Sequence, residues 1–530
     1  MGRKLLYDED SINDAAIAIR SKTGVSEKFT VSQFASLIEG CGEPESKDVD
    51  FYDYDGRRLY SYTSEQFMNL TSMPTLPDHT DIGLVNEGWN WGLNDIKELT
   101  DPHLNVGCTY YTSDGKTRIF YDIFKPCTQK IRAYASVNGG AILDWGDGSE
   151  PVTLTGSAAV YTHDYDTVGE YEVTLESVDN ATVYIGGNGT AAFGNTNNGF
   201  EPLKSMITGI FCGKNLCFKE YSLRELSDIR FITFNNRMYS GGSEANLING
   251  NGYGYPLNLG AIIIPNNFTM HGWHDFEHCL TRVVSMSPNI TTNNPQGTFA
   301  DCAVDRFINT FSKSNGALLG NSVNNRSNLK RVDVMYNDPN SFGLDTVKLY
   351  DQERTANIRD IYLHKMVALP QYHADSVSNY ATLHVPYNMY NDIMDTQWAT
   401  GYSGRLVQNP KKAWEDDYEV LTHPSELVAN TQINGTTGAA STNSNYMATD
   451  FIPVNPGETL YVCFNTSSND CCFYDSEKNR VDGDARLNYR TWNVDHHGYP
   501  FAVPAAAHYV RLSHGNAYMP YVTLWRELNN

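Results

Sequence analysis

Long apolar runs are missing from this sequence of 530 residues, and none approaches the roughly 18–20 residues that a membrane-spanning helix requires. We therefore expect no membrane insertion. Positive charge is also scarce, because 39 Lys and Arg stand against 62 Asp and Glu, which gives a formal charge of −23. Phosphate repels such a chain, which argues against sequence-independent nucleic-acid binding. With 41% hydrophobic and only 19% charged residues, the composition excludes a disordered tail and predicts buried cores.

The sequence also lacks the marks of secretion. Its ten cysteines are scattered, so they do not have the spacing of a disulfide framework. The segment Met1–Asp10 has two basic residues but neither an apolar core nor a small-residue cleavage site, so we expect no signal peptide. The glycosylation sequons at Asn188, Asn267 and Asn434 are therefore not expected to be modified, because that modification requires secretion.

Catalytic signatures are absent as well. The sequence contains no Gly-x-Ser-x-Gly, no His-Glu-x-x-His and no credible triad order, and Gly186–Gly189 is not followed by the Lys-Ser/Thr of a phosphate loop. We therefore predict no catalytic residue and no cofactor. A glycoside hydrolase stays open as an alternative, because its two carboxylates can lie far apart in the sequence.

A histidine-rich segment has, at first sight, the spacing of a metal site. His271, His274, His278 and Cys279 could supply zinc ligands. Cys279, however, belongs to a Phe-x-x-Cys pattern that recurs 23 positions later at Phe299–Cys302, without the histidines. Small buried residues of a repeat explain both cysteines better, so we predict no metal site.

A second candidate for cation binding is the turn Trp145–Gly148, which Asp144 precedes and which contains Asp147. Carboxylates beside such turns usually cap backbone N–H groups. We predict that role for both aspartates, with calcium binding as the alternative.

The residues that the sequence has in quantity indicate β-structure. Its 34 Tyr, 42 Gly and Asn-rich loops favour strands joined by turns, and we predict a mainly β, multi-domain fold. Only residues 1–40 have the apolar spacing of three to four that predicts two short helices, a helical hairpin. A segment of this length buries little apolar surface by itself, so we expect it to dock on a partner.

Two modules are predicted to follow the hairpin. Residues 48–126 contain strand and turn patterns around one helix start, which indicates a small α+β module. In residues 128–195, Tyr171, Val173 and Leu175 alternate with polar residues as in a half-buried strand, so we predict a β-rich module.

Residues 200–410 contain internal repeats: a Leu-x-x-Val-x-Val pattern returns after 29 and then 22 residues, and the Phe-x-x-Cys pattern returns after 23. One short strand in every 20–29 residues is typical of a leucine-rich-repeat solenoid, here an irregular one. The residues that fill the pattern are Leu226, Ile229 and Phe231; Leu329, Val332 and Val334; Ile358, Ile361 and Leu363; and Tyr380, Leu383 and Val385.

Residues 418–530 have short strands at a spacing of 8–12 residues, which predicts a C-terminal β-sandwich. An aromatic side chain beside hydrogen-bonding groups can stack on the apolar face of a sugar, and one cluster in this domain has that composition. We predict weak ligand-binding candidates at Tyr489, Trp492, His496 and Tyr499. The alternative is that this loop packs on its own sandwich.

Several segments resemble proteins of phage particles. The wording Ile-Asn-Asp-Ala-Ala-Ile-Ala-Ile and Phe-Thr-Val-Ser-Gln-Phe within residues 1–40 resembles the N-terminal segment of tail proteins from phages of Firmicutes, and residues 48–126 resemble a module of such structural proteins. The Trp-Gly-Asp-Gly turn followed by His163–Tyr165 resembles a PKD domain, an immunoglobulin-like sandwich. The Ile-Pro and Phe-x-x-Cys repeats resemble BspA-like leucine-rich repeats. "FIPVNPGETLYV" and "FAVPAAAHYVRLS" resemble jelly-roll, carbohydrate-binding-like domains of phage tail and fibre proteins.

These resemblances imply a virion protein that is made in the host cytoplasm without a signal peptide: a tail fibre, a baseplate component or a receptor-binding component. Its N-terminal region would join other virion proteins, and its C-terminal region would bind a glycan or protein of the host surface. The resemblance also implies a homo-oligomer, a trimer. A head-attached fibre or decoration protein and a bacterial surface adhesin are the alternatives, and the missing signal peptide counts against the adhesin.

Overall fold

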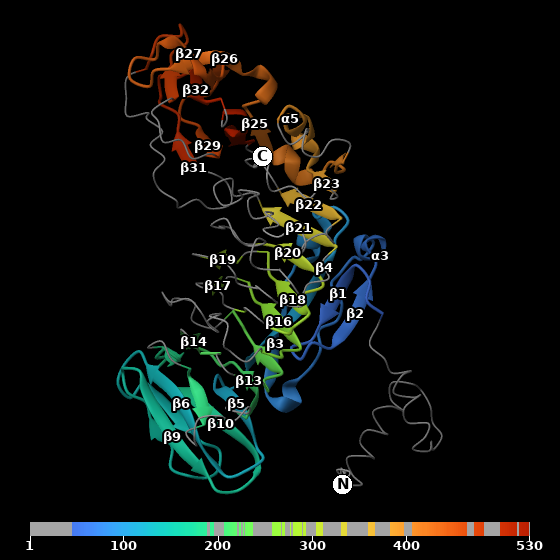
Figure 1. Ribbon diagram of the computed structural model, residues 1–530, viewed down its shortest axis with the longest axis vertical. Coiled ribbons are helices and arrows are strands. Elements are labelled where there is room, and N and C mark those ends of the chain that lie inside the picture. The colour runs from blue at the N-terminus through green and yellow to red at the C-terminus, as the bar shows by residue number, and fades with distance from the viewer. Residues whose placement is uncertain are drawn as a thin grey trace.

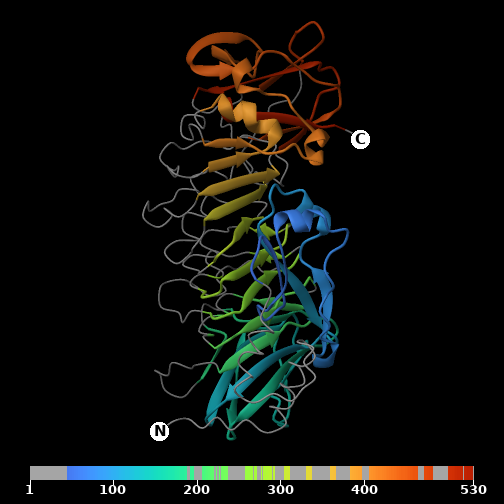
Figure 2. The same cartoon turned by 90° about the vertical axis from the view of Figure 1, so that its right-hand side faces the viewer.

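The computed structural model describes an elongated protein built mostly from β-strands (Figures 1 and 2). With 46% strand against 10% helix among the described residues, the prediction of a mainly β fold with several sheets is confirmed. No helix in this part of the chain is long and apolar enough to cross a membrane. The helical hairpin predicted for residues 1–40 lies outside the described residues. The structure describes residues 45–187, 191–195, 206–219, 222–223, 226, 228–236, 257–266, 268–270, 276, 279–288, 290–292, 304–310, 330–336, 359–365, 382–396, 405–463, 471–481, 499–516 and 519–528.

The N-terminal module (residues 45–112) is a four-stranded sheet with the strand order β2-β1-β4-β3, in which β1 and β4 run parallel. Gly56 has a φ of +87°, a conformation that favours glycine, in the turn between β1 and β2. Thr63 accepts the backbone N–H of Gln66 and so caps helix α3. The elements are β1 (Val49–Tyr52), β2 (Arg58–Tyr62), α3 (Ser64–Met68), η1 (Thr80–Ile82), β3 (Leu84–Trp89), α4 (Leu93–Lys97) and β4 (Leu104–Thr112).

Two sheets enclose the core of the first sandwich (residues 117–195). Val173 and Leu175 of β10 are buried in this core and Tyr171 packs against it, so the predicted alternation is confirmed. Residues 117–123, which were predicted to belong to the preceding module, form β5, and this strand pairs with β10 because its alternate apolar side chains face the sandwich core. The strands are β5 (Thr117–Ile123), β6 (Cys127–Ala135), β7 (Ala141–Asp144), β8 (Val152–Thr153), β9 (Ala159–Tyr165), β10 (Gly169–Ser177), β11 (Val183–Ile185) and β12 (Phe193–Asn195).

Parallel strands from successive repeats lie between the two ends of the molecule (Figure 2), and we call them the parallel ladder. Its first strand, β13, pairs with β5, so the ladder begins on the first sandwich. Val332 pairs with Ile361 and Ile361 pairs with Leu383, which confirms the predicted register of these repeats. The strands of the ladder are β13 (Ile207–Phe211), β15 (Phe231–Thr233), β16 (Ala261–Ile264), β18 (Val283–Met286), β20 (Phe307–Asn309), β21 (Arg331–Tyr336), β22 (Asp360–Lys365), β23 (Thr382–Val385) and β24 (Leu406–Gln408). Short strands beside it are β14 (Leu216–Phe218), β17 (Thr269–Met270) and β19 (Thr291–Thr292).

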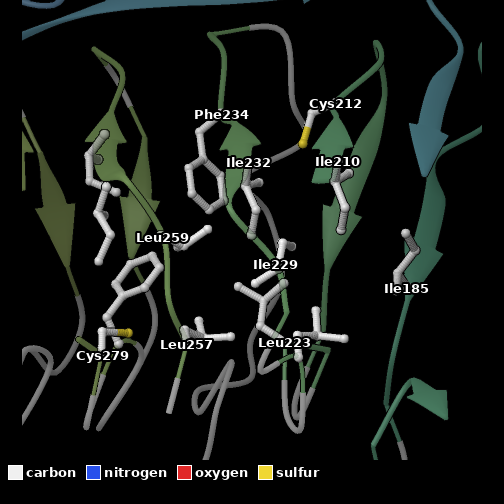
Figure 3. Packing of buried hydrophobic residues seen from close by; sticks show 14 of the residues in the cluster. Ile185, Ile210, Cys212, Leu223, Ile229, Ile232, Phe234, Leu257, Leu259 and Cys279 are labelled. Atoms are coloured by element: carbon white, nitrogen blue, oxygen red, sulfur yellow. The ribbon is translucent and has the colours of Figure 1, made fainter. Parts of the chain in front are cut away.

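One repeat was predicted in the wrong register. The predicted alignment has Leu226, Ile229 and Phe231 in the pattern, but the side chains that point into the core here include Ile229, Ile232 and Phe234 (Figure 3). Phe231 is only partly buried and packs in a different cluster, against the N-terminal module. Ile229, Ile232 and Phe234 have the same spacing as Leu226, Ile229 and Phe231, so a shift of three residues also fits the pattern. Burial and strand pairing distinguish the two alignments.

The predicted core role of the Phe-x-x-Cys motif is observed where the chain is described. Phe276 and Cys279 are both fully buried in the cluster that continues along the ladder. Figure 3 shows Cys279 among its apolar neighbours. A buried thiol of this kind packs as a small apolar side chain. The second copy of the motif, at Phe299–Cys302, and the three histidines lie outside the described residues.

The C-terminal sandwich (residues 418–528) lies at the opposite end of the ladder from the first sandwich (Figure 1). Its two antiparallel sheets enclose their own core, which includes Leu460, Phe473 and Leu524. Two short helices, η4 (Tyr387–Met389) and α5 (Tyr390–Met394), follow β23, and η5 (Ala413–Asp417) leads into the sandwich. The sandwich contains β25 (Tyr418–Val420), η6 (Pro424–Glu426), β26 (Val428–Ile433), β27 (Ala440–Ala448), β28 (Ile452–Pro453), β29 (Thr459–Cys463), β30 (Cys471–Tyr474), β31 (Tyr499–Ala502), β32 (Tyr509–Gly515), η7 (Met519–Tyr521) and β33 (Thr523–Glu527).

Candidate functional site

The outward face of the ladder is covered by the N-terminal module, and polar side chains join the two. The amide of Asn90 donates to the carbonyl of Ile264 at 2.9 Å and to the hydroxyl of Ser285 at 3.0 Å. Trp91 is 1% exposed, and its indole N–H donates to the carbonyl of Met286 at 2.7 Å. Buried polar groups are thus paired across the contact, as in a protein interior.

Apolar packing makes the same contact tight. Ile308 and Met335 point outward from the ladder and share a buried cluster with Phe51 of the module. A Cβ on Gly107 of β4 would lie 2.4 Å from Cγ2 of Ile263, so the backbone of β4 packs directly against the side chain of Ile263. Close packing of this kind leaves no room for a further chain or ligand at this point.

Arg331 of β21 is the charged centre of this interface. Its guanidinium donates to Asp333 at 2.8 and 2.7 Å and to Asp101 of the module at 2.9 Å. Nε2 of His364 lies 2.7 Å from Asp333, and Nδ1 of His364 accepts the backbone N–H of Thr100 at 3.2 Å. Burial opposes the ionisation of Asp333, but Arg331 and His364 hold the pKa of Asp333 below its ordinary value. Burial lowers the pKa of His364, which favours a neutral ring that donates from Nε2.

From β16 to β22 the outward face of the ladder is therefore an internal interface. The ring of Tyr362 on β22 is covered by side chains of the ladder itself. The guanidinium of Arg331 lies 3.6 Å from its centroid, and the ring of His384 stacks on it with 3.8 Å between the centroids. Over these strands the outward face of the ladder is covered, so it cannot bind a ligand. A site for an external partner has to lie elsewhere in the molecule.

The sugar-binding cluster predicted from the sequence falls almost entirely outside the described residues. Tyr489, Trp492 and His496 are not described. Tyr499 begins β31 and pairs through its backbone with Val462 of β29. The role of these four residues stays a prediction.

The two aspartates of the Trp-Gly-Asp-Gly turn bind the protein itself. Asp144 accepts the N–H of Gly146 at 2.9 Å, and Asp147 accepts the N–H of Ser149 at 3.0 Å. Asp147 also lies 2.7 Å from Nε2 of His163. Slight burial opposes the shift, but hydrogen bonds from Ser149 and His163 lower the pKa of Asp147 to about 2. Capping thus accounts for both carboxylates, and within the described ranges no three His, Cys, Asp or Glu side chains are grouped to hold a metal ion.

A pocket of about 340 Å³ opens in the C-terminal sandwich, beside the end of the ladder. Such a volume lies at the lower end of the range of ligand pockets, about 300–1,000 Å³. Apolar and acidic side chains line it together. The lining residues are Glu419, Val420, Leu421, Thr422, His423, Glu426, Leu427, Thr449, Asp450, Phe451, Ile452, Pro453 and Arg526.

Arg526 projects from β33 into the wall of the pocket between two carboxylates. Its Nε donates to Glu419 of the directly opposite position on β25 at 2.7 Å, and its terminal nitrogen lies 3.3 Å from Glu458. The hydrogen bond to Glu419 is the main reason why the pKa of Arg526 is raised. The guanidinium is therefore positioned and neutralised by the protein before any ligand enters.

Phe451 is the aromatic residue of the pocket wall, and two cations lie near its ring. Nζ of Lys478 is 4.5 Å from the ring centroid and Cζ of Arg511 is 4.8 Å from it. Arg511 also donates to the carbonyl of Thr449 at 3.1 and 3.0 Å. The preceding residue, Asp450, accepts the backbone N–H of Phe451 at 2.8 Å, which fixes the chain at the pocket mouth.

His423 joins the pocket wall to the ladder, because its Nδ1 lies 2.9 Å from Asp392 of α5. This hydrogen bond raises the pKa of His423. A raised folded-state pKa adds stability that is fully present below the unfolded value, about 6.5, and is lost as the pH rises through the folded value.

We expect Asp392→Asn to lower the thermal midpoint at pH 5.5, where His423 is charged, and to have a much smaller effect at pH 9. Asp395→Asn, at the exposed end of the same helix, is the matched control and should show no such pH dependence. Thermal unfolding of the three proteins at both pH values measures this. Equal effects of Asp392→Asn at pH 5.5 and 9 would contradict the assignment.

The pocket was not predicted, because no local signal in the sequence marks it. Its walls come from segments around Glu419–Leu427 and Thr449–Pro453 and from Arg526, which strand pairing brings together. No family model, no curated protein and no solved structure matches the chain. The pocket is therefore interpreted from its own chemistry.

Proposed function

We propose that the protein is a structural component of a phage virion, a tail fibre, baseplate or receptor-binding protein, that attaches the particle to glycans of the host surface. The first sandwich would be a PKD-like spacer, the ladder a BspA-like leucine-rich-repeat spacer, and the C-terminal sandwich a carbohydrate-binding-like jelly roll. The N-terminal region would bind other virion proteins, with trimers as the assembled form. A head-attached fibre and a bacterial adhesin remain the alternatives.

The observation that carries this proposal is where the open surface lies. The outward face of the ladder is occupied by the N-terminal module, whereas the C-terminal sandwich has a pocket and lies at one end of the long axis (Figure 1). A strut with its recognition site at one end suits a protein that displays a binding domain away from its attachment point. Parallel strands whose partners Ile262 and Val284 are 22 positions apart support the repeat assignment.

The full-length protein, labelled with a fluorophore, should bind to cells of at least one strain in a panel of Firmicutes. Mild periodate, which cleaves sugar diols, should abolish that binding. Binding that survives periodate would indicate that the receptor is a protein and not a glycan. No binding to any strain would contradict an attachment role.

A glycan hydrolase is the second candidate, because Glu419, Glu426 and Asp450 bring carboxylates to one pocket. We propose binding instead of catalysis, since Glu419 is bound to Arg526 and Asp450 holds a backbone N–H. Incubation of the protein with isolated cell-wall polysaccharide should release no reducing ends. Their release would establish the hydrolase.

A further inference from the structure

We infer that the pocket of the C-terminal sandwich takes a neutral sugar residue and rejects acidic ones. This inference rests on the proposed attachment to glycans and adds the class of sugar. Acidic sugars carry a carboxylate, a sulfate or a phosphate, which needs an available cation for strong recognition. The cations that surround the pocket therefore decide which class of sugar it takes.

Each cation described around the pocket already has a partner in the protein. Arg526 is bound to Glu419 and Glu458, and the imidazole of His423 to Asp392. These contacts commit the positive groups of the pocket wall to carboxylates.

The two remaining cations, Lys478 and Arg511, are engaged by the aromatic side of the pocket. Both lie within 5 Å of the ring of Phe451, and Lys478 is also 5.6 Å from the ring of Tyr509. Arg511 donates to the carbonyl of Thr449 in addition. Neither Lys478 nor Arg511 is among the lining residues of the pocket. An anionic ligand would therefore meet, in the lining, only the positive groups of Arg526 and His423, which are already bound to carboxylates.

The hydrogen-bond acceptors of the pocket, by contrast, suit hydroxyl groups. Asp450 uses Oδ1 for the backbone N–H of Phe451 and keeps a second carboxylate oxygen, and Glu426 adds another carboxylate to the lining. Ionised carboxylates accept strong hydrogen bonds from hydroxyl donors. Leu427 and Ile452 supply the apolar surface that the C–H face of a sugar ring covers. A neutral sugar satisfies both kinds of surface, whereas a negative substituent meets like charge.

The test is a glycan array with neutral hexose and N-acetylhexosamine oligosaccharides beside matched oligosaccharides that carry uronate or phosphate groups. The full-length protein should bind neutral members and leave the acidic ones unbound. Glu426→Ala should weaken binding at least about tenfold, as expected for the loss of a hydrogen bond to a charged group. Glu477→Ala, an exposed glutamate of the same sandwich outside the pocket lining, is the matched control and should bind like the wild type.

Three outcomes would overturn the inference: preferential binding of acidic members, no binding to any member, or equal binding by Glu426→Ala and the wild type. Asp450→Ala gives a second, independent test of the same wall. Failure on the array with intact, periodate-sensitive attachment to cells would remove the neutral-sugar pocket and leave the proposed attachment function standing. Failure on both would remove both.

Discussion

Replacing Asp333 by Ala is expected to lower the free energy of unfolding by about 3–5 kcal/mol, the usual cost of removing one partner from a buried ion pair. The carboxylate accepts two hydrogen bonds from Arg331 and one from His364, and the residue is 1% exposed. Among the described residues, its removal leaves Asp101 as the one acidic partner of the Arg331 guanidinium. Chemical denaturation at pH 7 measures the loss.

Asp360→Ala is the matched control on the adjacent strand. Asp360 also contacts a histidine, His384, at 2.9 Å, but its side chain is 41% exposed. A solvated pair of this kind contributes about 0–1 kcal/mol, so the two aspartates should differ by a factor of three or more. Similar losses for both variants would contradict the buried, interface-forming role of Asp333.

The stability that Asp333 adds also has a defined pH dependence. Its pKa is lowered in the folded protein, in spite of burial, by Arg331 and His364. The contribution is therefore present above the unfolded pKa, near 3.9, and disappears as the pH falls through the lowered folded value. The gap between wild type and Asp333→Ala should accordingly be constant from pH 6 to 8 and close in strong acid.

The second large effect is expected for Trp91→Ala, which should cost about 3–5 kcal/mol because it empties a large site at the interface between module and ladder. Trp91→Phe keeps an aromatic ring and loses mainly the hydrogen bond to Met286, so about 1 kcal/mol is expected. Hydrogen exchange identifies where the loss occurs. Amides of β4 and β18 should lose protection together in Trp91→Ala.

That joint loss distinguishes an interface from two independent bodies. Protection reports the local free energy of opening, and it is shared only by elements that open as one unit. If β4 alone lost protection while β18 stayed as in the wild type, the module would be a loosely attached appendage. The outward face of the ladder would then be accessible, and the argument that moves recognition to the C-terminal sandwich would fail.

The spacing of apolar residues predicted individual strands and the pairing of neighbouring repeats. The alternation of Val173 and Leu175 identified a strand, and the repeat of Val332, Ile361 and Leu383 identified parallel neighbours. Both signals arise from side-chain periodicity within one element. Around Ile229 the apolar residues fit the repeat pattern in two registers that differ by three residues, so periodicity does not choose between them, and the prediction was wrong.

Contacts between distant segments left no such signal. Asn90 and Ser285 are 195 positions apart, and nothing in either segment indicates that they meet. The pocket has the same origin, because Glu419 and Arg526 face each other only through the pairing of β25 with β33. The sequence indicated a different ligand-binding cluster, at Tyr489, Trp492, His496 and Tyr499, and its role stays a prediction.

The central claim is attachment of a phage particle through the C-terminal sandwich, and its most direct test is immunogold electron microscopy. An antibody against residues 418–530 would be applied to purified phage particles and to bacterial cells of the same culture. Gold at the distal end of the tail is the predicted result, and gold on the capsid would keep the virion assignment while moving the protein to a head fibre. Bare particles beside labelled cell surfaces would contradict the claim and favour an adhesin.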